Sequence, residues 1–508
     1  MGGGAGSGAA PGGQGGGTLA FARRATGRRA DRARALGVDP LGNVYVGGTF
    51  DSNGVFWDGQ VDQKTVAANA GSYDLFLAKV TPAGGLEWLR TAGNASDGDQ
   101  VLGVAALDQG VLVAGSHGNS ASGDVVLGPG EPSEIHLALN GFFFARYRAD
   151  GSLAWGRSTG GNHFGDINRI AATADGGMVA AGSFYGSVTF GPNEANQTTL
   201  VDQDTNVNDD GYVARFNSAG NLGWALQIRG PQRDLVQDVQ VAADGSAIVM
   251  GAFAESTVLP SRVGAPVTLT VAPGDGIDLF IADYDPNGSL RWVRQVSGPA
   301  QVDPHGLALM PDGGFVVTGT ITPSLSGTAR GRAVFGPGET AETALVGVYF
   351  DMFIARYDGD GRLLWARLAP GAYPDTHTVA VLPGGQVVVA GYFGNLGSPL
   401  RPDAIFGPGE PGGTTLTRLA GTDLMNGFLA WYRFDGTSSG ARIIAHGDSV
   451  FIAGAGATPG GGVVIAGGYG GHIVLGPLDP NPISYVKPGP AFVDNIGTQD
   501  IFVASFSP

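Results

Sequence analysis

The sequence of 508 residues contains no cysteine. Disulfide bonds, thiolate metal ligands and cysteine nucleophiles are therefore excluded. Long apolar runs are also missing, since no stretch approaches the roughly 18 residues of a membrane-spanning helix. The N-terminus lacks the basic and then apolar order of a signal peptide. The chain is thus either cytoplasmic or numbered from after a removed leader, and its glycine-rich start favours the second alternative.

Basic residues are scarce relative to acidic ones. The chain has 29 lysines and arginines against 45 aspartates and glutamates, which gives a net charge of −16. Nonspecific binding to nucleic acid needs clustered lysine and arginine, so no nucleic-acid partner is expected. The acidic surplus by itself indicates a surface that resists self-association.

Glycine, in contrast, is abundant at 89 residues. The first seventeen residues, MGGGAGSGAAPGGQGGG, offer no side chains to bury, so residues 1–17 are predicted to be a disordered tether. From residue 18 onwards glycine falls at turns between apolar runs. Because hydrophobic residues make up 43% of the chain, there is enough apolar surface for a substantial core.

One stretch recurs along the chain and is clearest from Asp351 to Arg367, DMFIARYDGDGRLLWAR. Alternating apolar residues on both sides of an Asp-Gly-Asp-Gly turn are typical of a β-hairpin. The hairpin tryptophans are Trp88, Trp155, Trp224, Trp292 and Trp365. In the sixth copy Ile443 is predicted to stand where the tryptophan is expected.

A strand motif of the form apolar-x-apolar-x-Gly recurs in phase with the hairpin. Its seven copies end at Gly48, Gly115, Gly182, Gly251, Gly319, Gly391 and Gly467. The chain also starts with half a hairpin at Thr18–Arg23 and ends with the other half at Ile501–Phe506. Pairing of these halves would close a ring without a free edge strand. We therefore predict an all-β, seven-bladed β-propeller as a single domain over residues 18–508. Its four-stranded blades would have about 70 residues each, and the N-terminal strand would close the ring by pairing with the C-terminal strand.

The repeated pattern DxFxARYDxxGxLxWAR, followed by DGxxxxAGSF and FGPGE, resembles that of the bacterial seven-bladed β-propeller repeat family. The resemblance covers essentially Thr18 to Pro508. It implies a secreted or cell-surface protein with a scaffolding or binding role rather than a particular reaction. The Asp-x-x-Gly-x-x-x-Trp hairpin is also similar to the tryptophan-docking motif of quinoprotein propellers, whose blades are shorter.

The connection between the second and third strands of each copy is long, whereas the other turns are short. It carries an aromatic residue or leucine before Gly-Pro at Leu127, Phe190, Phe335, Phe406 and Leu475. We expect this residue to anchor an extra hairpin on the face where these connections lie. Insertions on one face of a repeat protein often form its binding surface, so this face is the predicted binding site. The alternative is that the insertions only lengthen the wall of the blade.

An aspartate precedes the first strand of every copy, at Asp31, Asp99, Asp166, Asp234, Asp303, Asp375 and Asp448. A carboxylate at such a position typically accepts backbone N–H groups of a turn, so a structural role is predicted. Two positions further on the copies differ, with Ala33, Val101, Asn168, Val236, His305, His377 and Val450.

The two histidines in that series fall on adjacent copies. His305 and His377, beside Asp303 and Asp375, could bind a divalent metal or act as acid and base. His163 and His446 could line the same rim. The alternative is that these imidazoles only form hydrogen bonds.

The favoured interpretation is a monomeric, non-enzymatic, secreted or cell-surface module without a cofactor, which binds a protein or a glycan or acts as a scaffold. The competing class is an enzyme, either a metal-dependent hydrolase or lyase at the channel mouth or a quinoprotein-like oxidoreductase. A purely structural spacer is a third alternative. A transition metal would occupy the histidine site. Calcium could bind the polar stretch Asp204–Gly211, which lacks the glycine and glutamate of an EF-hand loop.

Overall fold

The computed structural model describes residues 17–27, 31–51, 53–68, 73–94, 98–118, 124–137, 141–202, 208–272, 276–323, 331–348, 350–371, 375–394, 403–419, 425–487 and 499–508. These residues form β-strands and no helix, so the predicted all-β class is confirmed. It follows that the described segments include no helix capable of crossing a lipid bilayer. The predicted tether, residues 1–17, lies outside the described residues except for Gly17.

Each sequence repeat forms antiparallel strands that lie side by side in chain order. In the first repeat these are β2 (Arg32–Val38), β3 (Val44–Asp51), β6 (Tyr73–Val80) and β7 (Leu86–Ala92). The second and third repeats contain β8 (Gln100–Leu107), β9 (Gly110–His117), β12 (Gly141–Tyr147) and β13 (Leu153–Ser158), then β14 (Gly160–Ala172), β15 (Met178–Phe190), β17 (Asp210–Phe216) and β18 (Leu222–Ile228). The fourth and fifth contain β19 (Asp234–Val241), β20 (Ala247–Ala254), β23 (Ile277–Tyr284) and β24 (Leu290–Val296), then β25 (Ala300–Leu309), β26 (Phe315–Pro323), β29 (Asp351–Tyr357) and β30 (Leu363–Ala369).

The last two repeats share one long strand, β36 (Ser438–Ala457). The sixth repeat contains β31 (Asp375–Val381), β32 (Val387–Gly394), β35 (Met425–Tyr432) and the first part of β36. The seventh contains the second part of β36, β37 (Val463–Leu475), β39 (Asp500–Phe506) and β1 (Leu19–Thr26). The N-terminal strand therefore stands in the place that the fourth strand has in the other repeats.

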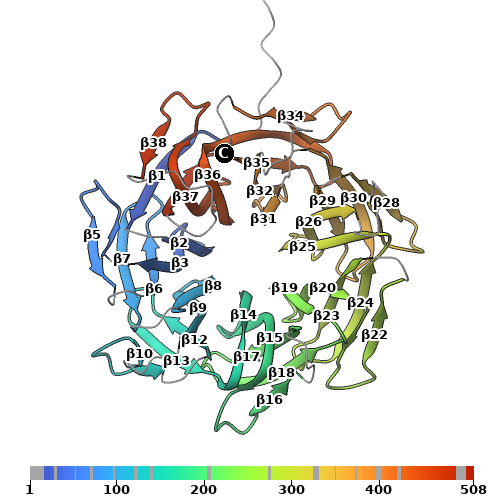
Figure 1. Cartoon of the computed structure of the whole chain (residues 1–508), viewed down its shortest axis with the longest axis horizontal. Helices are drawn as coiled ribbons and strands as arrows, with labels where there is room; N and C mark the ends of the chain where they lie inside the picture. Colours follow the sequence, from blue (N-terminus) through green and yellow to red (C-terminus); the bar gives the residue numbers. More distant parts are fainter. Residues whose placement is uncertain are drawn as a thin grey trace, which may run out of the picture.

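The sheets stand around a common centre (Figure 1). The first strand of a repeat, such as β2, β8 or β25, lies nearest to this centre, and the fourth strand lies towards the outside. The core consists of layers between successive sheets. Phe144 of the second repeat and Phe216 of the third, for example, are both buried, and their ring centroids are 4.5 Å apart.

The two ends of the chain pair with one another. β1 runs antiparallel to β39, with Ala22 opposite Ala504 and Ala25 opposite Ile501. Ala22 and Ala25 are buried, and Phe21 packs in the core between this sheet and the first repeat. At its end β1 also pairs with a short strand of the first repeat.

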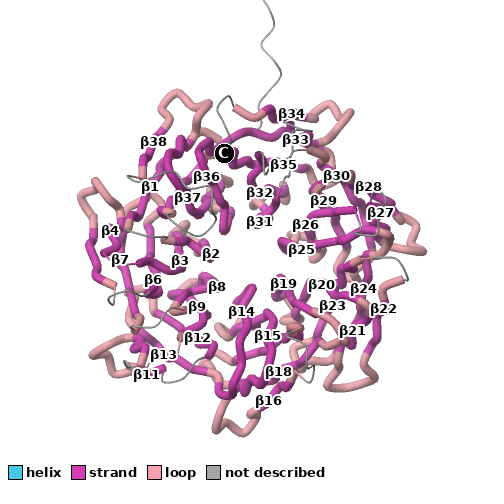
Figure 2. Tube along the Cα trace, in the orientation of Figure 1, coloured by secondary structure: helices cyan, strands magenta, loops and turns pink. Residues whose placement is uncertain are grey.

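A second set of short strands lies between the second and third strands of the repeats, and we call these pairs the outer hairpins. They are β4 (Asn53–Phe56) with β5 (Lys64–Ala67), β10 (Val125–Leu127) with β11 (Ile135–Leu137), the end of β15 with β16 (Thr198–Val201), β21 (Ser256–Leu259) with β22 (Val267–Thr270), β27 (Gly331–Phe335) with β28 (Thr343–Gly347), β33 (Asp403–Phe406) with β34 (Thr414–Thr417), and the end of β37 with β38 (Ile483–Val486). Figure 2 shows their pink turns at the outer edge of the molecule.

The outer hairpins run along the outside of the sheets rather than standing on one face. In the fifth repeat the Glu339 carboxylate, in the hairpin turn, accepts a hydrogen bond from the backbone N–H of Leu363 at 2.6 Å. Leu363 begins the fourth strand, at the opposite end of the sheet from the place where the hairpin leaves the second strand. The anchoring prediction is confirmed, since Phe335 is fully buried and packs on Phe353 with ring centroids 5.0 Å apart. The expected position on a face is wrong, and the hairpin lengthens the wall instead.

Successive sheets are joined through the tryptophan of the hairpin motif. Its indole N–H donates to a carbonyl in the hairpin turn of the next repeat, as from Trp88 to Ala149 at 2.9 Å. A glycine of the same turn lies against the indole ring. Gly361 has a φ of +74°, and a Cβ there would lie 2.8 Å from Trp292. Only glycine combines this conformation with such close packing.

The sixth copy replaces this arrangement in a way that motif alignment did not predict. The strand register places Gly440, and not Ile443, at the position that Trp365 has in the preceding repeat. Gly440 lies directly opposite Trp431, which is buried. The tryptophan of this repeat is thus on the neighbouring strand, where Trp431 belongs to the same core cluster as Val463 and Phe506 of the seventh repeat.

Candidate functional site

The innermost strand of every repeat contains a β-bulge at the same place. The residue opposite the motif glycine is followed by one extra residue, after which pairing resumes. The seven extra residues are Arg34, Leu102, Asn168, Gln237, His305, His377 and Ala453, and we call them the bulge residues. Six of them have described side chains, and all six are partly or fully exposed on the strands nearest the centre. Bulges of this kind re-aim side chains and recur next to binding sites.

This register corrects the predicted equivalences. His305, His377 and Asn168 are bulge residues, whereas Ala33, Val101 and Val236 are the buried residues that precede a bulge. Val450 lies three residues before the bulge residue of its repeat. The predicted series therefore mixed two sides of the strand, because a shift of one residue turns a side chain to the other face.

The aspartates that precede the innermost strands divide in the same way. Asp31, Asp99 and Asp234 lie two positions before the residue opposite the motif glycine and are buried. Asp166 and Asp303 lie one position before it, on the side that reaches solvent. Asp375 shares the position of Asp166 and Asp303, whereas Asp448 lies four positions before the residue opposite its motif glycine, so the predicted aspartates occupy three different positions.

Three of these aspartates have the expected structural role. Asp31 accepts the backbone N–H of Asp51 at 2.9 Å, and Asp99 accepts that of Gly118 at 2.9 Å. Asp448 accepts the backbone N–H of His472 at 2.9 Å. Burial raises the pKa of Asp31 to about 8, although its hydrogen bond from Asp51 opposes the shift. Asp31 is thus a candidate for a carboxyl that stays protonated at neutral pH.

The predicted histidine pair can be followed only in part. His305 lies beside the Thr320 hydroxyl, with Nε2 and Oγ1 3.3 Å apart. Asp303 accepts two contacts from the Gln301 side-chain amide, at 3.0 and 3.2 Å. Asp375 and His377 belong to β31, but their side chains lie outside the described residues. The structure therefore leaves the pairing of the two imidazoles as a prediction.

His163 and His446 lie away from the bulge residues. In the strand register His163 is opposite Gly186 and His446 is opposite Val474. Gly186 directly precedes the segment that pairs with β16, and Val474 pairs with β38. His446 Nδ1 is 3.2 Å from the Asn426 amide oxygen, and burial lowers the pKa of this histidine. The side chain of His163 lies outside the described residues, so the expectation that these two histidines share a rim with His305 stays a prediction.

The described side chains do not form a metal centre. Across these segments no group of three or more histidine, aspartate and glutamate residues is placed to bind one metal ion. Most of the predicted calcium-binding stretch, Asp204–Gly211, lies outside the described residues.

A cavity of about 400 Å³ opens beside the innermost strands of the first and seventh repeats. We call it the inner cavity. Arg32 and Arg34 line it from β2, and Phe451 and Ala453 line it from β36. Gln499, just before β39, completes it. Burial and the neighbouring Arg32 lower the pKa of the Arg34 guanidinium, whereas Asp166 raises it.

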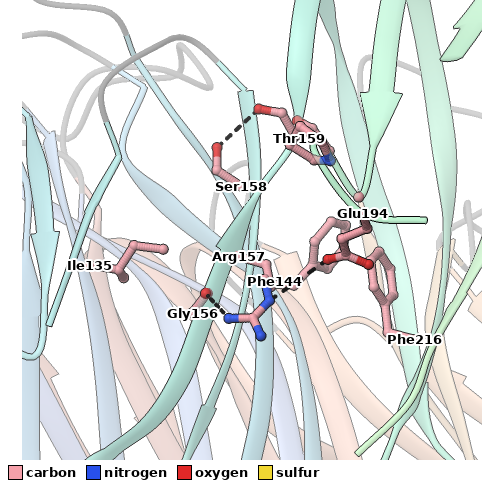
Figure 3. Close-up of a pocket in the computed structure, with 10 residues that line it drawn as sticks. Ile135, Phe144, Gly156, Arg157, Ser158, Thr159, Glu194 and Phe216 are labelled. Carbon is pink, nitrogen blue, oxygen red and sulfur yellow. Dashed lines mark hydrogen bonds and ion pairs between the residues drawn. The ribbon is translucent and has the colours of Figure 1, made fainter. Parts of the chain in front are cut away.

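A second cavity, of about 290 Å³, lies in the outer wall between the second and third repeats. Figure 3 shows Phe144 and Phe216 at this cavity, with Arg157 extended towards Glu194. The Arg157 Nε and Glu194 Oε1 atoms are 3.9 Å apart. The same ion pair recurs at other junctions, between Arg294 and Glu339 at 3.6 Å and between Arg367 and Glu410 at 3.8 Å. Because its charged pair recurs in this way, the cavity belongs to the framework.

The inner strands also contain an ion pair that the sequence did not indicate. Arg169 Nε lies 3.3 Å from Asp238 Oδ1, and each residue directly follows the bulge residue of its repeat. Asp238 Oδ2 accepts the backbone N–H of Leu307 at 2.9 Å, so the contacts join three repeats. Burial raises the pKa of Asp238, and Arg169 opposes that shift. The corresponding residues elsewhere are smaller, such as Ala35 and Gly103.

Comparisons with known proteins leave the identity of the chain open. The sequence matches no protein-family model and no curated protein. Among solved structures it is similar to Sqt1 from Chaetomium thermophilum, with 11% identity, a TM-score of 0.33 and coverage of 86% of this chain and 94% of that one. It is also similar to puromycin hydrolase, with 14% identity and a TM-score of 0.26 over 72% of this chain and 59% of the hydrolase. Similarities this weak carry no argument about function.

Proposed function

We propose that the chain is a seven-bladed β-propeller that acts as a binding or scaffold module for a protein or a glycan. The repeated sheets around one centre and the pairing of β1 with β39 support the ring architecture. In this proposal residues 18–508 form one domain of a monomeric protein, and the family resemblance supports a secreted or cell-surface location.

The observation that carries the binding function is the contrast between framework and bulge residues. The tryptophan, glycine and outer-hairpin contacts recur from repeat to repeat. Apart from the two histidines, the bulge residue is of a different type in each repeat. The other types include arginine, leucine, asparagine and glutamine. A repeated framework with individual side chains at equivalent exposed positions suits recognition, because each position can contact a different part of one ligand.

This proposal places the binding surface at the end of the ring near the bulge residues. The innermost strand starts at this end, and the connection from the second strand to the outer hairpin leaves from the same end. It is thus the face that the sequence favoured. The outer hairpins fold away from this face, so we assign ligand binding to the bulge residues rather than to those hairpins.

The absence of cysteine permits a selective test. A single Gln237→Cys substitution introduces a reactive thiol at a bulge residue, and Asn287→Cys introduces one in an exposed hairpin turn at the opposite end. Each full-length variant is coupled to a large polyethylene glycol maleimide. Binding is then measured against an array of defined glycans and a phage-displayed peptide library.

We expect ligands for the unmodified protein, loss of binding after coupling at residue 237, and retained binding after coupling at residue 287. Failure of both libraries to yield a ligand would overturn the binding function. Equal effects of the two couplings would overturn the proposed face. For the enzyme alternative, elemental analysis of the purified protein is decisive, because about one bound transition metal per chain would favour a metal-dependent hydrolase or lyase.

A further inference from the structure

We propose that the inner cavity binds a short oligosaccharide that carries a carboxylate, in other words a uronate. This inference rests on the proposed binding function and adds a site and a ligand class to it. Its basis is the pair of arginines on β2, the aromatic wall opposite them and the acidic surroundings of the remaining ring.

Arg32 and Arg34 supply the positive charge. They lie two residues apart on the same strand, on either side of buried Ala33, so both side chains reach the same cavity. Burial and then the repulsion from Arg32 lower the pKa of Arg34. An anion between them would relieve that repulsion, and a guanidinium presents its donors in the fork geometry that suits a carboxylate.

In the described segments Arg34 lacks the carboxylate partner that several framework arginines have. Arg169 pairs with Asp238, and Arg356 pairs with Asp312 at 2.5 Å. Within the described part of the chain Arg34 forms no hydrogen bond and no ion pair within 4.0 Å. Asp166 influences its pKa without forming an ion pair with it. In a chain with a net charge of −16, an exposed cation without a carboxylate partner is available to an external anion.

Phe451 and Gln499 supply the other contacts that a sugar needs. The partly exposed ring of Phe451 lines the cavity together with Ala453. The negative face of an aromatic ring attracts the polarised C–H groups on one side of a sugar. The Gln499 side chain offers both a donor and an acceptor for hydroxyl groups. A cavity of about 400 Å³ is of the size typical of small-ligand sites.

The charge distribution favours a uronate over an acidic peptide. Beyond the two arginines the same ring of positions holds Asp166 and Asp303, whose carboxylates accept hydroxyl donors but repel further anions. A uronate has one carboxylate on each hydroxyl-rich ring, whereas an acidic peptide adds carboxylates without hydroxyls.

The test is titration calorimetry of the full-length protein with trigalacturonate at low salt. Galactotriose serves as the neutral counterpart, and triaspartate as the acidic peptide. Arg34→Gln removes one charge, Arg34→Lys retains it, and Arg362→Gln removes an exposed charge from a distant hairpin turn. Thermal unfolding of each variant confirms that it folds.

We expect trigalacturonate to bind at least about tenfold more tightly than galactotriose or triaspartate, because a hydrogen bond to a charged group contributes that much. Arg34→Gln should weaken binding about tenfold or more, whereas Arg34→Lys should weaken it less and Arg362→Gln hardly at all. Binding should also decline as salt is raised.

Equal binding of the neutral sugar, stronger binding of triaspartate, or indifference to Arg34→Gln would each overturn the uronate site. The binding function would survive these results if the glycan array or peptide library had yielded a ligand blocked at residue 237. If trigalacturonate does not bind and both libraries fail, the two proposals fall together.

Discussion

The strand formed by the N-terminus offers a direct test of the ring architecture. Removing residues 1–16 leaves every described residue in place, whereas removing residues 1–27 deletes β1. The second truncation exposes β39 and takes Phe21 away from the first repeat. The two variants therefore differ only by the strand that pairs the ends of the chain.

The expected loss of stability can be worked from the side chains of β1. Phe21 is only 7% exposed, and removal of a buried phenylalanine side chain costs about 3–5 kcal/mol. Ala22 and Ala25 are buried and add about 0.8 kcal/mol for each methyl group. The sum is about 5 kcal/mol, a large part of the 5–15 kcal/mol that typically stabilises a protein. For a cooperative unit of this length, the unfolding entropy converts it to a decrease in Tm of about 5 °C.

The measurement is thermal unfolding followed by circular dichroism, repeated in urea. We expect the first truncation to melt like the full chain and the second to melt about 5 °C lower. A synthetic peptide of residues 17–27 should restore the loss, and a scrambled peptide should not. Equal melting temperatures for the two truncations would refute the reasoning, because β1 would then contribute nothing to the ring.

Three further predictions concern single positions. Gly361→Ala should lower the unfolding free energy by about 2 kcal/mol or more in urea titration, because alanine is strained at positive φ and its Cβ would press on Trp292. Burial raises the pKa of Asp31 to about 8 from its ordinary value of 3.8, so its folded state retains a proton that the unfolded state has lost. Stability should therefore fall as pH rises from about 4 to 8, and Asp31→Asn should reduce this slope by up to about 1.4 kcal/mol per pH unit. If His305 and His377 bind a transition metal, the double substitution to alanine should abolish the metal measured by mass spectrometry and leave melting unchanged.

Each of these predictions has its own control and its own contradicting result. Gly384→Ala is the matched control for the glycine, since a Cβ there meets no atom within 4 Å, and equal effects would contradict the packing argument. For Asp31, parallel curves of stability against pH in the wild type and the asparagine variant would show that this carboxyl does not titrate as proposed. For the histidines, unchanged metal content in the double variant would place any metal elsewhere.

Much of the framework could be predicted because it depends on local patterns that recur. Alternating apolar residues and glycine turns identified the hairpin from Asp351 to Arg367, which forms β29 and β30. The apolar residue before Gly-Pro correctly indicated a buried anchor at Phe335. The direction of the outer hairpins was not predictable in this way, since it depends on the contact between Glu339 and the distant backbone of Leu363.

The candidate site was harder to predict because one inserted residue changes which side chains face solvent. Alignment on the preceding aspartates placed Ala33 beside His305, although only His305 is a bulge residue. The motif glycine on the following strand is the signal in the sequence that identifies the bulge residue. Every bulge residue except Leu102 lies 14 residues before the motif glycine of its repeat, so counting back from that glycine identifies Arg34 as the counterpart of His305.

The bulges also explain how the same strands can build a framework and vary in chemistry. Residues directly before a bulge, such as Val101 and Val236, are buried and apolar in most repeats because they pack between sheets. The extra residue is released from that requirement, since a bulged residue leaves the regular ladder. Residues directly after a bulge return to the packed layer, where Asp238 is tolerated because Arg169 and the backbone of Leu307 satisfy its charge. Selection for a ligand can therefore act on one position of each repeat without loosening the core, and that freedom is the physical reason for seeking the binding site among these residues.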